Sequence, residues 1–280
     1  MKKIIISLLA LLISTACAKE NFAFKGTESI NDATWGDYQT ILNKVVKARQ
    51  YESINGVFCH NGVNYQLLRE DQDLKDKVDQ QAKVLTTVKV PEEKKAKLAF
   101  WMNAYNFFTL LELQRNPKVK SMKKLGWKNK RLNVSGALVS LDQIEHKLIR
   151  PLKDPRIHFA INCASVGCPS LGKFIFTSAT VDTQLNALTK EALRNPLHIR
   201  PYSDSAVATT KLFSWFSGDF KVQPYGSLKG FVKVFAPKAY HGKKIKTKIS
   251  YDWDMNTVEN VDAKIKKLAK EFPDLKITLM

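Results

Sequence analysis

Acidic residues are scarce in this chain of 280 residues: 26 Asp and Glu stand against 45 Lys and Arg, a formal net charge of +19. Arginine is scarce as well, with 8 residues against 37 lysines. Arginine supplies the planar, bidentate fork that recognises phosphates and carboxylates, so a surplus made of lysine is typical of general surface charge. The composition therefore indicates a basic surface and no specific nucleic-acid partner.

Other features are also missing. Four cysteines are too few for a fold built on disulfides. Beyond the N-terminus no stretch reaches the roughly 18 apolar residues of a membrane-spanning helix, which excludes a membrane enzyme. There is no internal repeat, low-complexity tract or Gly/Ser linker. With 44% apolar and 25% charged residues, the chain has the composition of a folded protein, and we expect one domain over residues 25–280.

The N-terminus reads as a secretory signal peptide over residues 1–18. Two lysines precede a short apolar run over residues 4–13, and small residues follow. Ala16 and Ala18 form an A-x-A pair, which favours cleavage after Ala18 and a periplasmic or secreted protein. The alternative is lipidation of Cys17, which would attach the protein to the membrane surface. Cleavage after Ala18 leaves Cys59, Cys163 and Cys168, and this odd number implies a free thiol or an intermolecular bond.

The pattern of apolar residues mixes helices and strands without a regular βαβ rhythm, which favours an α+β fold. Several elements are expected, each from its spacing and its turn or capping residues: helices over 37–51, 91–116, 182–193, 211–220 and 261–272, a hairpin over 131–140, and strands over 156–162 and 197–210. Residues 238–249 are expected to be strand or loop. Within the helix over 91–116, the apolar residues of the segment 100–113 go all the way round, so we expect this helix to be central and buried against a mainly antiparallel sheet.

The segment DPRIHFAINCASVGCPSL, residues 154–171, is the first candidate site. A strand ending at Asn162 would lead into a loop of small residues that includes Ser165, and functional residues concentrate on such loops. Cys163 and Cys168 allow four interpretations: a local disulfide, a nucleophilic thiolate, part of a zinc site, or ordinary packing. A thiolate needs a nearby cation, and His146 or His158 would supply it. Zinc needs two further ligands, so we expect no metal.

Two other segments carry polar groups. Ser140 and Gln143 form a capping box for a short helix with Glu145 and His146, which serve one site from two sides because neighbours on a helix point about 100° apart. On the central helix, Asn103 and Asn106 share one face. These two amides either hold neighbouring loops by hydrogen bonds or line a site.

Positive charge is concentrated in two acid-free stretches. Residues 118–131 hold six lysines and Arg131, and residues 229–248 hold seven lysines. Such stretches suit an anionic polymer or a protein partner in the cell envelope. Both lie outside residues 145–168 in the sequence, so we expect them to govern location rather than chemistry.

Six motifs occur in an order that resembles the bacterial and plant family known as domain of unknown function 547: NGVNYQLL, FWMNAYN, SLDQIEH, DPRIHFAINCASVGCPSL, KLFSWFSGDF and YDWDMN. The resemblance covers roughly residues 33–256. The chain departs from the family pattern at Asn64, Met102, Asp254 and Met255, none of which is a candidate site residue. The resemblance implies a core similar to papain-like and transglutaminase-like thiol enzymes, in which Cys, His and an acid or amide cooperate.

Two functions follow from these features. The first is an exported cysteine-dependent hydrolase or transferase acting on amide or ester bonds of a small-molecule or peptide substrate, without a cofactor. Cys163 would be the nucleophile and His146 the general base, with His158 in reserve. Glu145 or Asn103 would orient the imidazole or contact the oxyanion. Asn106, Asn162, Ser165 and Cys168 would contact substrate. The second is a non-catalytic envelope protein that binds an anionic polymer or a protein. Thiol–disulfide exchange ranks third, because enzymes of that class favour two residues between the cysteines.

Overall fold

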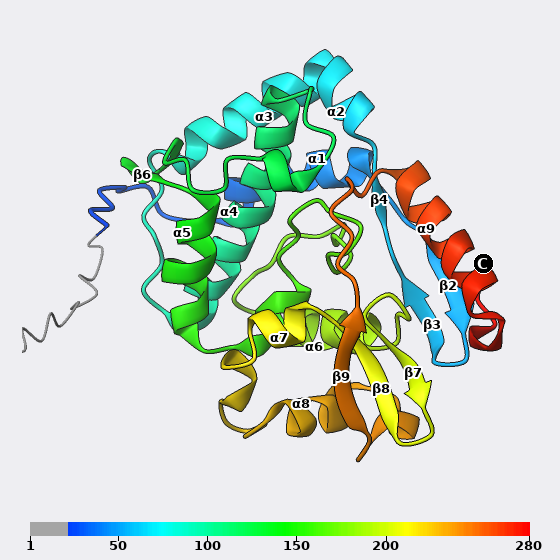
Figure 1. Ribbon diagram of the computed structural model, residues 1–280. Helices are drawn as coiled ribbons and strands as arrows, with labels where there is room; N and C mark the ends of the chain where they lie inside the picture. Colours follow the sequence, from blue (N-terminus) through cyan, green and yellow to red (C-terminus); the bar gives the residue numbers. More distant parts are fainter. Residues whose placement is uncertain (1–21) are drawn as a thin grey trace, which may run out of the picture.

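The computed structural model describes residues 22–280 (Figure 1). The expected signal peptide, residues 1–18, and the alternative lipidation at Cys17 lie outside the described residues and stay predictions. Within residues 22–280, no helix is long and apolar enough to cross a membrane.

The chain forms an α+β fold, which confirms the fold class expected from the sequence. The α-helices of the described residues are α1 Gly36–Val45, α2 Tyr65–Glu70, α3 Gln72–Leu85, α4 Lys94–Arg115, α5 Leu141–Gln143, α6 Val181–Ala192, α7 Leu212–Trp215, α8 Leu228–Phe235 and α9 Val258–Glu271. Short 3-10 helices are η1 Asp32–Trp35, η2 Met122–Lys124, η4 Arg150–Leu152, η5 Pro155–Phe159, η6 Asp219–Lys221, η7 Lys238–Tyr240 and η8 Pro273–Leu275, and η3 Ile144–Ile149 is a π-helical turn.

The strands form four small sheets: β1 Val46–Lys47 with β4 Gly62–Val63; β10 Thr278–Leu279 with β2 Gln50–Ser53 and β3 Gly56–Cys59; β5 Leu132–Val134 with β6 Ala137–Val139; and β7 Ile199–Ser203, β8 Ala206–Thr210 and β9 Lys244–Ile249 in that order. Every pair is antiparallel except β8 with β9. The register shifts once within each pair of the last sheet.

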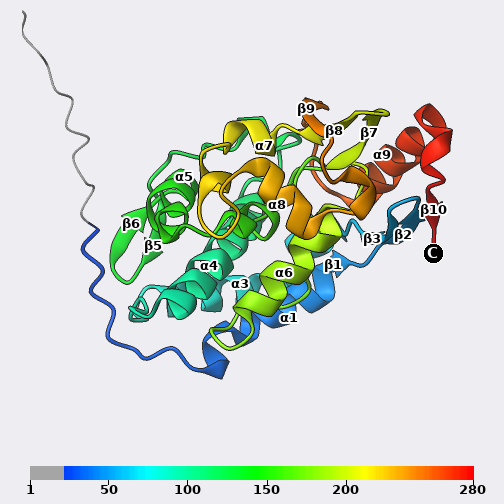
Figure 2. The same ribbon diagram turned by 90° about the horizontal axis from the view of Figure 1, so that it is seen from below.

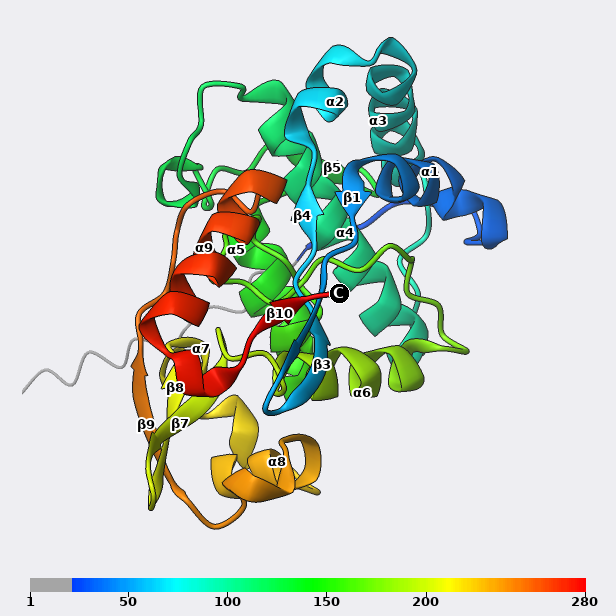
Figure 3. The same ribbon diagram turned by 90° about the vertical axis from the view of Figure 1, so that its right-hand side faces the viewer.

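These elements lie in three groups (Figure 1). Helices α1 to α5 occupy one side, the β7–β9 sheet with α7 and α8 lies at the bottom, and the β2–β3 hairpin with α9 lies at the right. Seen from below, α6 and α8 lie nearest the viewer, and α6 contacts both α8 and α4 (Figure 2). From the right-hand side, α9 and the C-terminal strand β10 cover the outer edge (Figure 3). The green loops of residues 160–176 run through the middle, between the three groups (Figure 1).

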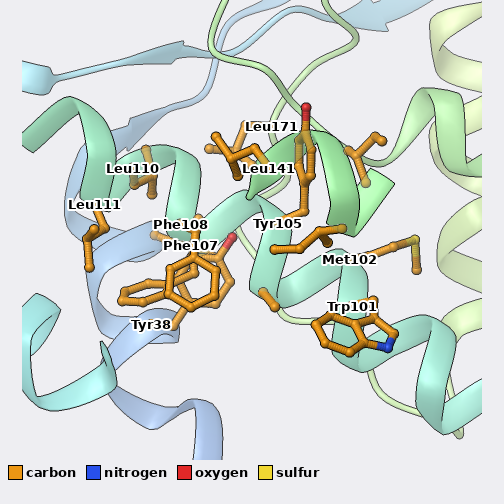
Figure 4. Packing of buried hydrophobic residues seen from close by; sticks show 14 of the residues in the cluster. Tyr38, Trp101, Met102, Tyr105, Phe107, Phe108, Leu110, Leu111, Leu141 and Leu171 are labelled. Carbon is orange, nitrogen blue, oxygen red and sulfur yellow. The ribbon is translucent and has the colours of Figure 1, made fainter. Parts of the chain in front are cut away.

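Helix α4 is the centre of the largest core. Glu93 caps its N-terminus by accepting hydrogen bonds from the backbone of Lys95 and Ala96, and every residue from Leu98 to Leu113 is buried. The elements that contact α4 most are the turn η3 and helices α2, α5 and α6. In Figure 4, Phe107 and Phe108 lie beside Tyr38, whereas the hydroxyl group of Tyr105 points away from this aromatic cluster. The expected central buried helix is therefore confirmed.

The expected hairpin and capping box also form. Ser135 and Gly136 both adopt positive φ, at 51° and 81°, as a tight turn between β5 and β6 requires. The Ser140 side chain accepts from the Gln143 N–H, and the Gln143 side chain accepts from the Ser140 N–H. This reciprocal cap starts the helix that continues directly into η3.

Two expected elements are wrong. The helix over 37–51 ends at Val45, and the chain continues as β1 and β2, because the segment pairs with β4 and β3. The strand over 156–162 does not form. Asp154 accepts a hydrogen bond from the Arg156 N–H, Pro155 supplies a helical φ angle, and residues 155–159 form η5. The loop that carries Cys163 therefore follows a 3-10 helix rather than a strand.

Candidate active site

A pocket of about 200 Å³ brings most of the chemically active side chains together. Its walls come from α4, α5, η3, η5, the loop of residues 161–169, α7 and the segment after β9. The lining residues are Tyr105, Trp127, Asp142, Glu145, His146, His158, Ile161, Cys163, Cys168, Pro169, Leu212, Trp215, Phe216, Tyr251 and Trp253. Six of them are Trp, Tyr or Phe, so polar groups at the base are surrounded by aromatic rings.

The Cys163 thiol is bound by three side chains. Its Sγ atom lies 3.1 Å from Ser165 Oγ, 3.0 Å from the Tyr251 hydroxyl and 2.7 Å from Cys168 Sγ. Burial raises the pKa of the Cys163 thiol, but hydrogen bonds from Cys168, Ser165 and Tyr251 outweigh burial and lower this pKa to about 7. An ordinary thiol has a pKa near 8.5, so about half of Cys163 is thiolate at neutral pH.

Glu145 is the carboxyl group whose charge the pocket most disfavours. Burial raises its pKa, the nearby Cys163 raises it further, and the result is about 7 despite the opposing effects of Arg150 and the Tyr105 hydroxyl. The Tyr105 hydroxyl donates to Glu145 Oε2 over 3.4 Å. Glu145 is therefore protonated in a substantial fraction of molecules at neutral pH, as a general acid must be.

The two imidazoles belong to a separate network around Asp219. Arg150 donates from Nε and Nη2 to the Asp219 carboxylate over 2.7 and 2.9 Å, and His158 Nε2 lies 2.8 Å from the same carboxylate. Burial opposes the negative charge of Asp219, but hydrogen bonds from His158 and Arg150 hold its pKa well below the usual range. An ionised carboxylate accepts only, so His158 Nε2 donates, and in the neutral ring Nδ1 carries the lone pair.

His146 is held in one neutral tautomer. Arg150 Nη1 lies 3.1 Å from His146 Nδ1, and a guanidinium group can only donate, so Nδ1 accepts. The ring proton is then on Nε2, 3.8 Å from Asp142 Oδ1. Burial lowers the pKa of both His146 and His158. Both rings are therefore mainly neutral at pH 7.

The sequence predicted that His146 or His158 lies beside the Cys163 thiol and lowers its pKa, and the geometry corrects this prediction. Among residues 22–280, the side chains that hydrogen-bond to Cys163 are Ser165, Cys168 and Tyr251, and none is a histidine. His146 and His158 share the pocket with Cys163 but contact other groups. The thiol pKa is lowered by hydroxyl and thiol donors, not by an imidazolium ion.

Asn103 does not reach the pocket. Its amide exchanges two hydrogen bonds with the Phe176 backbone, both 2.9 Å long. It holds the segment before α6 against α4, which is the structural alternative considered from the sequence. The expected catalytic role of Asn103 therefore has no support in its position.

Asn106 and Asn162 hold the cysteine loop rather than line the pocket. Asn106 donates to the Ala160 carbonyl over 3.0 Å and accepts from the Asn162 N–H over 2.7 Å. Asn162 in turn accepts from the Ala164 N–H over 2.7 Å and donates to the Pro169 carbonyl over 2.6 Å. Both amides are buried, and they act as positioning residues for Cys163.

The segment after β9 completes the loop's support. The Val166 and Gly167 N–H groups donate to the backbone carbonyls of Asp254 and Asp252, each over 2.8 Å. A Cβ atom at Gly167 would lie 2.7 Å from the Asp252 nitrogen, so this close approach requires glycine. The pairing brings Tyr251 to Cys163 across 88 residues of sequence.

Several pocket residues were not singled out as site residues from the sequence. Tyr105, Tyr251, Trp215 and Trp253 all lie within the motifs that resemble the family, and this was the available signal. Trp215, Tyr251 and Trp253 form a cluster with ring centroids 4.6 to 5.8 Å apart, and Trp215 is 48% exposed. An exposed tryptophan at a pocket edge is typical of a binding surface.

The basic stretch of residues 118–131 also reaches this pocket, contrary to the separation expected from the sequence. Trp127 lines the pocket, and Lys123 Nζ lies 5.8 Å from the centre of the Trp253 ring. The six lysines of the stretch are exposed, and Arg131 pairs with the buried Glu112. Within residues 22–280, no group of three or more His, Cys, Asp or Glu side chains is arranged to hold a metal ion.

Fold and site together define an α+β protein with an acidified thiol at the base of an aromatic-walled pocket. Residues 88–192 match the model of the family described as protein of unknown function, DUF547. The resemblance inferred from the motifs is thus confirmed over a segment that contains Glu145, His146, His158 and both loop cysteines. No curated protein and no solved structure matches the chain. The papain-like or transglutaminase-like core stays a prediction.

Proposed function

We propose that this chain is an exported cysteine-dependent hydrolase or transferase that acts on amide or ester bonds. The observation that carries the proposal is a thiol with a pKa of about 7 in the same pocket as a carboxyl group with a pKa of about 7. Thiol enzymes need an ionised sulfur to attack and a protonated group to release the product. Near neutral pH, this pair supplies both.

The reaction begins when the Cys163 thiolate attacks the carbonyl carbon of the substrate. The carbonyl electron pair moves to oxygen, and the Tyr251 hydroxyl, 3.0 Å from the sulfur, is placed to donate to this oxyanion. Collapse of the intermediate expels the amine or alkoxide, which takes the proton from Glu145. Cys163 is then joined to the acyl group as a thioester.

Water or another acceptor completes the cycle. Glu145, now ionised, takes a proton from the attacking nucleophile, which adds to the thioester carbonyl and releases Cys163 as thiolate. His158 Nδ1, which keeps its lone pair because Nε2 donates to Asp219, is a second base. The aromatic walls exclude water from the reacting groups and bind the apolar part of the substrate.

Alkylation with iodoacetamide at graded pH tests the nucleophile. We expect the rate at Cys163 to rise with pH and reach its half-maximum near pH 7, about 1.5 units below a free thiol. Cys59 is an internal control, because burial and the nearby Glu191 raise its pKa to about 12. Peptide mapping separates the two. A half-maximum for Cys163 near pH 8.5, with no acyl adduct after p-nitrophenyl acetate treatment, would contradict the proposal.

A second candidate function is binding of an anionic polymer through the exposed lysines of residues 118–131, which border the pocket through Trp127 and Lys123. We expect retention on immobilised polyglutamate at low salt that declines steeply as salt is added. Replacing Lys123, Lys124 and Lys128 by Gln should remove most of this retention. The same change at Lys229, Lys233 and Lys238 in the other basic stretch is the matched control. Equal losses in both variants would show that general charge, and not this surface, binds the polymer.

A further inference from the structure

We propose that Cys163 and Cys168 are a dithiol pair that reacts with a disulfide substrate and closes into an internal disulfide. This activity goes beyond the proposed function, because it needs no acyl substrate. The two sulfur atoms lie 2.7 Å apart, and both cysteines are free thiols in this structure. A disulfide has a sulfur–sulfur distance of about 2.05 Å, so closure requires a movement of well under roughly 1 Å.

The loop holds the two cysteines together although four residues separate them. Ala164 adopts a left-handed backbone conformation with φ of 61°, which turns the chain directly after Cys163. The Cys168 N–H then donates to the Ser165 carbonyl over 3.0 Å, and the Cys163 N–H donates to Cys168 Sγ over 3.0 Å. A left-handed conformation is unfavourable for a residue other than glycine, and it is maintained where the surrounding structure requires it. Four intervening residues are unusual for thiol–disulfide exchange, but this turn brings the two sulfur atoms together despite that spacing.

The environments of the two thiols differ as exchange requires. Cys163 is partly exposed and lines the pocket, whereas Cys168 is 5% exposed. Burial and the neighbouring Cys163 raise the pKa of Cys168 well above its usual value, while that of Cys163 is lowered. The accessible, acidic sulfur attacks the substrate, and the buried sulfur resolves the intermediate.

The reaction balances without any further reagent. The Cys163 thiolate attacks one sulfur of a disulfide R–S–S–R, the substrate bond breaks, and one thiolate RS⁻ leaves. Cys168 loses its proton, which Glu145 or the departing thiolate accepts, and its sulfur attacks Cys163 Sγ. The mixed disulfide breaks, a second RS⁻ leaves, and the protein disulfide forms. The dithiol is oxidised by two electrons, and the disulfide substrate is reduced to two thiols.

Glutathione disulfide is a suitable probe for the full chain. Cys163 and Cys168 lie on one tryptic peptide, residues 157–173, while Cys59 and Cys17 lie on others. In the native protein, we expect this peptide to lose two hydrogen atoms and to carry little glutathione. In Cys168→Ser, glutathione should remain on Cys163, with on the order of tenfold more mixed disulfide than in the native protein. In Cys163→Ser, Cys168 should stay unmodified because it is buried.

The decisive comparison is between the native protein and Cys168→Ser. If glutathione accumulates equally on Cys163 in both, Cys168 does not resolve the intermediate and the inference is wrong. Thermal unfolding of each variant, followed by circular dichroism, shows whether it is folded at the assay temperature. The glutathione and p-nitrophenyl acetate experiments test thiol–disulfide exchange and acyl transfer independently of each other. Acylation of Cys163 by p-nitrophenyl acetate without internal disulfide formation removes exchange alone, whereas disulfide formation without acylation removes the hydrolase alone.

Discussion

The Glu145→Gln variant is expected to hydrolyse an alkyl ester, whose leaving group needs a proton, about 100- to 10,000-fold more slowly than the native protein, while its Cys163 thiol alkylates faster near pH 7.5. Glutamine keeps the size of the side chain but has no proton to give to a leaving group. It also removes a negative charge near the sulfur. Because like charges disfavour each other mutually, loss of this charge makes the Cys163 thiol easier to ionise at any pH where Glu145 is ionised in the native protein.

The interaction between Glu145 and Cys163 also determines how the alkylation rate of the variant depends on pH. Near pH 7.5 Glu145 is largely ionised in the native protein and opposes ionisation of the thiol, so alkylation is faster in the variant. Below about pH 6 Glu145 is protonated, and the two alkylation rates are similar. Above about pH 8 the thiol is ionised in both proteins, and the two alkylation rates converge. Hydrolysis of the native protein should show a maximum near pH 7, since it needs thiolate and protonated Glu145 together. Stopped-flow measurements of both reactions on one preparation separate the electrostatic role of Glu145 from its role in proton transfer.

Glu191→Gln is the matched control for this experiment. Glu191 is likewise a half-buried carboxyl group beside a cysteine, and burial raises its pKa too, but it contacts Cys59 outside the active-site pocket. We expect hydrolysis and Cys163 alkylation to be unchanged in this variant. A fall in hydrolysis as large as that of Glu145→Gln would show that the loss reflects stability rather than catalysis.

The second large effect concerns the buried amides of α4. Asn106→Ala should lower the free energy of unfolding by about 2–5 kcal/mol, because it leaves the Ala160 carbonyl and the Asn162 N–H unpaired in the interior. For a chain of this size, the melting temperature falls by roughly 10 °C. Because the same bonds hold the cysteine loop, the half-maximum for Cys163 alkylation should move upward from pH 7 toward the value of a free thiol. Urea unfolding and pH-dependent alkylation measure the two effects.

The Asn103→Ala variant separates the loss of stability from the change in Cys163 alkylation. It removes two hydrogen bonds of nearly the same length from the same helix, but to Phe176 rather than to the cysteine loop. We expect a similar loss of stability with unchanged alkylation of Cys163. If both variants alter the alkylation profile equally, the loop is not positioned by Asn106, and the profile follows global stability instead.

Features of the fold that depend on residues close together in the sequence could be predicted, whereas those that depend on distant residues could not. Local signals were mostly reliable: the turn at Ser135–Gly136 and the Ser140–Gln143 box both form. The long helix expected to open at Pro91 begins instead at Lys94, with Glu93 as its cap. The strand expected over 156–162 does not form, because a short buried apolar segment has no periodicity that separates strand from helix. The proline and the Asp154 cap at its start decided the outcome.

The candidate site shows the same difference between local and long-range interactions. Local sequence signals were enough to identify the loop that carries the thiols, and to show that Glu145 and His146 follow a capped turn nearby. Tertiary structure decided their chemistry, because the pKa of a thiol depends on groups within hydrogen-bond distance, and for Cys163 these include Tyr251, 88 residues away. It also turned both imidazoles toward Asp219, Arg150 and Asp142, and brought the basic stretch of residues 118–131 to the pocket. The scarcity of acids predicted a basic surface, and folding placed part of that surface beside the thiol.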